Sequence, residues 1–139
     1  AIVITLFHTN TFQDQKYTSY FEPYHDVISV RNDQNDLLKA MSHYSSDEYA
    51  EAIGIFESLP PSDTIYLYNS QCYLALENYD SAIVNLNNIP NQSIFREQKN
   101  WYLGLSYLLK GDKEKAKAEF GKISKGEFQH NQLKTIDDM

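Results

Sequence analysis

The side chains best suited to chemistry in this sequence are its histidines, its single cysteine and a few neighbouring carboxylates. The four histidines are scattered, and none forms an HExxH motif or a paired metal-ligand spacing with Cys72. They lie at His8, His25, His43 and His130. We therefore expect no metal site and no cofactor.

Nucleophilic and acid–base catalysis are also poorly supported. Cys72 lies in the run YNSQCYLAL, where a small buried hydrophobe is a better interpretation than a nucleophile. The pairs Asp47–Glu48 and Asp137–Asp138 are sequence neighbours, which suits turns and chain ends rather than two facing acids. The sequence predicts no catalytic residue, and an enzyme is the least favoured class of function.

The charge distribution argues against nucleic acid as a partner. The net charge is -7, and the first 95 residues carry 3 basic against 12 acidic side chains. Lysines do gather between Lys110 and Lys125, but acidic residues interleave them, as on a solvated helix face. We expect no nucleic-acid binding.

The secondary-structure elements of the chain are predicted to form a repeat. The segments EYAEAIGIFESL, NYDSAIVNLNNI and DKEKAKAEFGKI align on Ala52, Ala82 and Ala116, at spacings of 30 and 34 residues. Large apolar residues follow each alanine by four and by seven positions, which places them on one helical stripe. These segments are predicted to be three copies of one helix.

A second helix is predicted before each copy, after a short polar break such as SSDE, EN or KGD. Ala40, Ser70 and Gly104 stand twelve residues before the three alanines, and such small side chains allow two antiparallel helices to cross closely. Nine residues before each alanine lies a flat ring, suited to the gap between neighbouring hairpins: His43, Tyr73 and Tyr107.

This pattern of small, aromatic, alanine and apolar positions resembles the tetratricopeptide repeat over about residues 33–124. The resemblance implies an all-α fold, a right-handed superhelical stack of about three helical hairpins (33–60, 63–90 and 97–124). Apolar residues at Phe128, Leu133 and Ile136 predict a capping helix over 127–138, so the repeat domain would span 31–139. Asp36, Lys39 and the early prolines Pro60 and Pro90 depart from the family pattern.

Residues 1–30 do not fit the repeat. Their opening run, AIVITLF, is far shorter than the roughly 20 residues that span a bilayer, so membrane contact would require an anchor that precedes it. Whether residues 1–7 end such a helix is left open. The segment YFEPYHDVI (20–28) is similar to one found before the repeats of bacterial membrane-anchored tetratricopeptide-repeat proteins. That resemblance implies an N-terminal tether and an extracytoplasmic, periplasmic location, with a cytoplasmic one as the alternative.

The family resemblance also implies a binding groove, because first helices line the concave face of such stacks. The positions that would line it carry no cation, so a clamp for a C-terminal carboxylate is not expected. We expect instead a protein or peptide partner that presents an apolar segment. They are Leu37, Met41, Tyr44, Leu67, Gln71, Leu74, Trp101, Leu105 and Leu108.

Two alternatives stay open for this groove. Residues 1–30 could fill it, which would leave a structural homo-oligomerisation module, or Trp101, Leu105 and Leu108 could be plain inter-helix core. For the N-terminal segment we expect Tyr20–Ile28 to dock on the first hairpin and Ala1–Phe7 to pack loosely.

Overall fold

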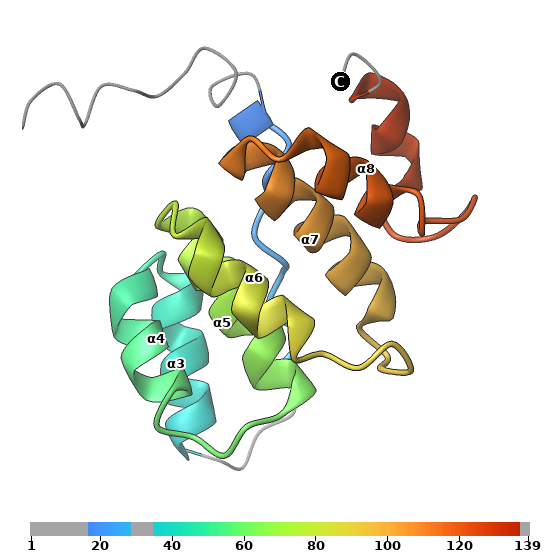
Figure 1. Cartoon of the computed structure of the whole chain (residues 1–139). Helices are drawn as coiled ribbons and strands as arrows, with labels where there is room; N and C mark the ends of the chain where they lie inside the picture. The colour runs from blue at the N-terminus through green and yellow to red at the C-terminus, as the bar shows by residue number, and fades with distance from the viewer. Residues whose placement is uncertain (1–16, 29–34, 137–139) are drawn as a thin grey trace, which may run out of the picture.

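The computed structural model describes residues 17–28 and 35–136, and within these ranges it contains helices, turns and extended segments but no strand. Residues 1–7 and the expected boundary near residue 30 lie outside the described residues. Among the described residues, the helices from residue 35 onward follow one another in this order (Figure 1): α3 (Asn35–Ser45), α4 (Tyr49–Phe56), α5 (Asp63–Ala75), α6 (Tyr79–Asn87), α7 (Arg96–Lys110), α8 (Lys113–Phe120) and the 3₁₀ helix η1 (His130–Thr135).

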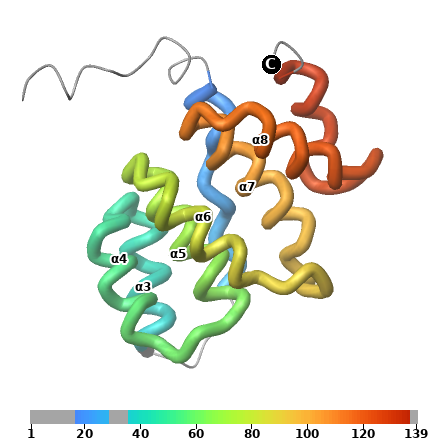
Figure 2. Tube along the Cα trace, in the orientation of Figure 1, coloured from blue at the N-terminus to red at the C-terminus, as the bar shows by residue number. Residues whose placement is uncertain are grey.

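The helices pair as three hairpins, α3–α4, α5–α6 and α7–α8, and each hairpin packs on the next (Figure 2). The expected all-α helical-repeat stack is confirmed. Polar side chains begin several helices: Ser62 Oγ accepts from the Ile65 amide, and Asp112 Oδ1 accepts from the Lys115 amide.

The turn inside each hairpin has the same backbone geometry. Asp47, Glu77 and Gly111 occupy equivalent positions, five residues before the repeat alanines, and have positive φ angles of 59°, 59° and 95°. The next residue donates its amide to a carbonyl of the preceding helix, as Asn78 N does to Tyr73 O at 2.8 Å. A left-handed residue at this point is what reverses the chain so tightly.

Close helix crossing explains the small residues. Ala40, Ser70, Ala52, Ala82 and Ala116 are all fully buried. At Gly104, a Cβ atom would lie 2.3 Å from the Phe120 ring, so the third hairpin has no room for a side chain there. Glycine is required because the α8 ring packs directly on the α7 backbone.

Replacing Gly104 with alanine should therefore lower the free energy of unfolding by about 1–3 kcal/mol, because the buried Phe120 ring must move. The matched control is Gly54→Ala in α4, where nothing lies within 4 Å of the new Cβ. That variant should gain up to about 1 kcal/mol from helix propensity. Urea denaturation of both proteins makes the comparison, and equal effects would contradict the packing argument.

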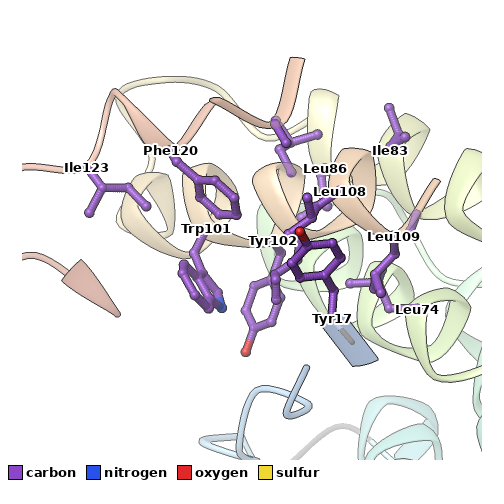
Figure 3. Close-up of a cluster of buried hydrophobic side chains, with 14 of the residues drawn as sticks. Tyr17, Leu74, Ile83, Leu86, Trp101, Tyr102, Leu108, Leu109, Phe120 and Ile123 are labelled. Carbon is purple, nitrogen blue, oxygen red and sulfur yellow. The ribbon is translucent and has the colours of Figure 1, made fainter. Parts of the chain in front are cut away.

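The core lies in two clusters. One joins α3, α4 and α5 around Met41, Phe56 and Tyr68. The other joins α5 to the C-terminal residues, and Figure 3 shows its side chains gathered around Trp101 and Tyr102. The Trp101 and Phe120 rings in it lie 5.4 Å apart, centroid to centroid.

The C-terminal cap differs from the expected helix over 127–138. Gly126 and Gln129 adopt positive φ angles, and the 3₁₀ helix η1 begins only at His130. An α-helix does not form because local groups are used elsewhere: the Phe128 amide donates to Glu97, and Glu127 binds Arg96 at 2.7 Å. The apolar residues still pack on the third hairpin, with Ile136 buried.

Candidate functional site

Residues 17–28 lie along the surface that α3, α5 and α7 form together, called here the first-helix face. The concave groove predicted from the sequence lies on this face. The segment has few hydrogen bonds of its own beyond the turn at Tyr17–Phe21. Its main chain is instead held by side chains of the first helices.

The central first helix, α5, provides the most of these contacts. Tyr68 accepts from the Val27 amide at 3.1 Å through its hydroxyl oxygen, and the same hydroxyl donates to the His25 carbonyl at 2.9 Å. Gln71 Oε1 accepts from the Tyr24 amide at 3.2 Å. One helix thus binds three backbone groups of the segment.

The two outer first helices bind the same segment. The Tyr102 hydroxyl of α7 donates to the Glu22 carbonyl at 2.8 Å, and the Tyr44 hydroxyl of α3 donates to the Tyr24 carbonyl. All three hairpins therefore contact residues 17–28. Tyr20–Ile28 contacts the first hairpin as expected, through Tyr44, and Gln71 and Tyr102 extend its contacts to the other two hairpins.

Aromatic side chains of the segment add apolar contacts. The Tyr24 ring lies 6.0 Å from Tyr68, and it meets Phe95 and Phe128 edge-on at 6.5 and 5.9 Å. Phe21 meets Tyr102 edge-on at 6.3 Å. Tyr24 is the central side-chain contact of the segment, since its ring joins the second hairpin, the start of the third and the C-terminal residues.

The segment also reaches the C-terminal cap. The Tyr20 hydroxyl donates to the Thr135 carbonyl at 2.9 Å. Beside this contact lies a small, mainly polar hollow of about 80 Å³ between the segment, Trp101 of α7 and the cap residues Gln129 and Gln132. The N-terminal segment and the cap thus meet at one end of the first-helix face.

Eight of the nine residues expected to line the groove are buried, and Leu37 is half-buried. Tyr44 and Gln71 bind the segment's backbone, while Leu74 lines a hollow with Thr18 and Phe21. None of the nine is an exposed apolar side chain in this structure. Leu67, Leu105 and Leu108 belong to the hydrophobic core between the helices.

Two contact residues, Tyr68 and Tyr102, are absent from the expected set. Each stands fourteen residues before a repeat alanine, one position after a groove position, and both are buried. A tyrosine at the same repeat position in two hairpins is a usable signal, because a buried phenol needs a hydrogen-bond partner. Leu38 occupies that position in the first hairpin and cannot supply one.

Burial raises the pKa of all three tyrosines that donate to the segment. For Tyr68 the value rises to about 12, with burial as the largest cause, and for Tyr44 and Tyr102 burial raises the pKa strongly. The folded protein therefore keeps these phenols neutral, which is the form that donates to a carbonyl.

This predicts a loss of stability at alkaline pH. A raised pKa in the folded state adds stability that is fully present below the unfolded value near 10 and is lost as the pH rises toward the folded value. Urea denaturation between pH 9 and pH 11.5 should show falling stability. Tyr68→Phe should show a shallower fall over this range, and an identical slope in both proteins would contradict the assignment.

The described residues contain no group of three or more histidine, cysteine or acidic side chains arranged to hold a metal ion. Within the same residues, no helix is both long and apolar enough to cross a bilayer.

Comparison with known proteins finds two family matches. The model described as "Anaphase-promoting complex, cyclosome, subunit 3" matches residues 13–89, and one described as "Tetratricopeptide repeat" matches residues 100–125. Neither the curated proteins nor the solved structures that were compared contain a significant match. Because the first model covers more than half of the chain, the protein belongs to the family described as anaphase-promoting complex, cyclosome, subunit 3, and its hairpins are tetratricopeptide repeats.

Proposed function

We propose that this protein is a scaffold whose first-helix face holds an extended polypeptide through its main chain, and that its own residues 17–28 take that place. Tetratricopeptide repeats generally mediate protein–protein interaction, and members of the family are typically not enzymes. In the same way, this protein is proposed to bind a polypeptide and not to act as an enzyme.

The observation that carries the proposal is the set of contacts from α3, α5 and α7 to the segment's backbone. Tyr44, Tyr68, Gln71 and Tyr102 together bind three carbonyls and two amides between Glu22 and Val27. Peptide sites bind extended segments in this manner, since main-chain bonds fix the backbone and pockets select the side chains.

Tyr24 supplies the side-chain selectivity in this proposal. Its ring is surrounded by Tyr68, Phe95 and Phe128, and Phe21 packs on Tyr102 three residues earlier. A polypeptide that replaced the segment would need an aromatic residue at the position of Tyr24 and a second aromatic three residues before it.

Binding in trans tests the proposal. A labelled peptide of residues 17–28 should bind the full chain weakly, because the tethered segment competes at an effective concentration on the order of millimolar. Tyr24→Ala should weaken the tethered segment and so increase the affinity for the added peptide. Fluorescence anisotropy measures both affinities.

The matched control is Glu22→Ala, because the Glu22 side chain is exposed and its carbonyl is the group that binds Tyr102. It should leave peptide affinity unchanged. A scrambled peptide that binds equally well, or a Tyr24→Ala protein that binds no better than the unmodified chain while its circular dichroism spectrum is unchanged, would contradict the proposal.

A membrane tether before the repeats is a second part of the proposal. It is supported by the resemblance of Tyr20–Ile28 to the segment that precedes the repeats in bacterial membrane-anchored proteins. It implies a repeat domain on the extracytoplasmic, periplasmic side. Fractionation of cells that express the full-length gene tests it, and recovery of the protein in the cytoplasmic fraction alone would contradict it.

Homo-oligomerisation is the alternative to a binding scaffold. It is favoured if residues 17–28 stay on the first-helix face, because a partner protein would then need another surface. Light scattering over a hundredfold range of protein concentration separates the two, because an oligomer module gains mass with concentration and a scaffold stays monomeric until its partner is added.

A further inference from the structure

A second hollow lies between the first two hairpins and is separate from the first-helix face. Its two adjoining parts, of about 190 and 290 Å³, share Glu57 and Asn85. The lining comes from the end of α4, from α5 and from α6, and residues 17–28 contribute nothing to it. It includes Tyr66, and Val84 beside it is 62% exposed.

Asn69 lines this hollow, and its buried side-chain oxygen has no hydrogen-bond donor among the described residues. Asn69, only 3% exposed, uses its amide nitrogen to donate to Asn85 Oδ1 at 3.2 Å. Asn85 in turn donates to the Ser81 carbonyl at 2.9 Å. This fixes the orientation of both amides and leaves Asn69 Oδ1 buried without a donor. An unpaired buried oxygen is costly, so a bound group that donates a hydrogen there would be favoured.

The charge around the hollow attracts a cation. From residue 36 to residue 95, which covers the first two hairpins, eight aspartates and glutamates stand against one basic residue, Lys39. Glu57 and Asp80 lie in the lining itself. Asp80 already pairs with Lys110 at 2.5 Å, whereas Glu57 only accepts from the Tyr73 hydroxyl. Glu57 therefore keeps its charge uncompensated by any cation among the described residues.

We propose that this hollow binds an arginine side chain presented by a partner protein. The guanidinium would donate to the Glu57 carboxylate and to Asn69 Oδ1, and its flat face would lie against the Tyr66 ring. Five donors in one plane can serve a carboxylate and an amide oxygen together, which an ammonium group cannot do with the same geometry. Val84 would contact an apolar neighbour of that arginine.

The test is a titration of the ¹⁵N-labelled full chain at physiological salt with two probes, Nα-acetyl-arginine amide and Nα-acetyl-lysine amide. The arginine probe should shift the side-chain amide resonances of Asn69 and Asn85 saturably. The lysine probe should bind at least about tenfold more weakly. Its ammonium group lacks the planar, forked donors with which a guanidinium makes charge-assisted hydrogen bonds.

Two variants check the assignment. Glu57→Gln should weaken the arginine probe about tenfold, as expected for loss of a charge-assisted partner. Glu51→Gln removes an exposed carboxylate of α4 that lies outside the lining and should change nothing. Equal shifts from both probes, spread over acidic residues such as Glu51 and Glu77, would mean general charge attraction and would overturn the proposal, as would the absence of shifts at Asn69.

Discussion

A chain that lacks residues 1–28 should lose several kcal/mol of its free energy of unfolding and should populate unfolded or aggregated species. The deletion removes buried Tyr17 and the packed rings of Phe21 and Tyr24, and it exposes Trp101 and Tyr102. Each large side chain contributes about 1.5–3 kcal/mol when fully buried. A domain stability of about 5–15 kcal/mol cannot absorb several such losses unchanged.

Urea denaturation and size-exclusion chromatography measure this effect. Truncation at Phe7 is the control, because it removes none of the contacts described for residues 17–28, and it should cost little. Within the segment, Tyr24→Ala should cost about 2–3 kcal/mol and Glu22→Ala almost nothing, since only the Glu22 carbonyl is used. An unchanged denaturation midpoint after the long deletion would show that the segment is a linker.

The second large effect is expected at Tyr68. Its ring is fully buried against Tyr24, Tyr44 and Phe56, and its hydroxyl binds two backbone groups of the segment. Tyr68→Ala should cost about 3–5 kcal/mol, as for other large aromatic truncations. Tyr68→Phe keeps the ring and should cost about 1–3 kcal/mol, because the His25 carbonyl and the Val27 amide lose their partner.

Tyr66→Phe on the same helix is the matched control. Tyr66 is half-buried, and no hydrogen bond of its hydroxyl is found in residues 17–28 or 35–136, so its removal should stay within about 0.5 kcal/mol. Chemical denaturation gives all three values. If Tyr68→Phe cost no more than Tyr66→Phe, the hydroxyl of Tyr68 would not be holding the segment.

The repeat architecture could be predicted because it depends on the spacing of small and apolar residues along each helix. Ala52, Ala82 and Ala116 mark the second helix of each hairpin, and each is fully buried where that helix crosses its partner. Gly104 and Gly111 also follow from the pattern, one at a close helix crossing and one at a tight turn. Helical periodicity and helix crossing depend on residues close in sequence, so one sequence is enough.

The course of residues 17–28 could not be predicted in the same way. It depends on contacts such as Tyr102 to Glu22, which join residues 80 positions apart, and on carbonyl and amide groups that every residue possesses. No side-chain pattern in the segment reports which helix will bind its backbone. The 3₁₀ form of the cap could not be predicted for a related reason. The Phe128 amide donates to Glu97 of α7, and the Glu127 carboxylate pairs with Arg96 of α7.

Amide hydrogen exchange of the unmodified full chain shows whether residues 17–28 occupy the first-helix face, because it reports on the segment's own backbone. The Tyr24 and Val27 amides donate to Gln71 Oε1 and to the Tyr68 hydroxyl, so both should exchange much more slowly than in an unstructured peptide. In Tyr68→Phe, protection should fall at Val27 more than at the helical amides of α7. Exchange of Tyr24 and Val27 at the rates of a free peptide, with the helices still protected, would contradict the claim that residues 17–28 occupy the first-helix face.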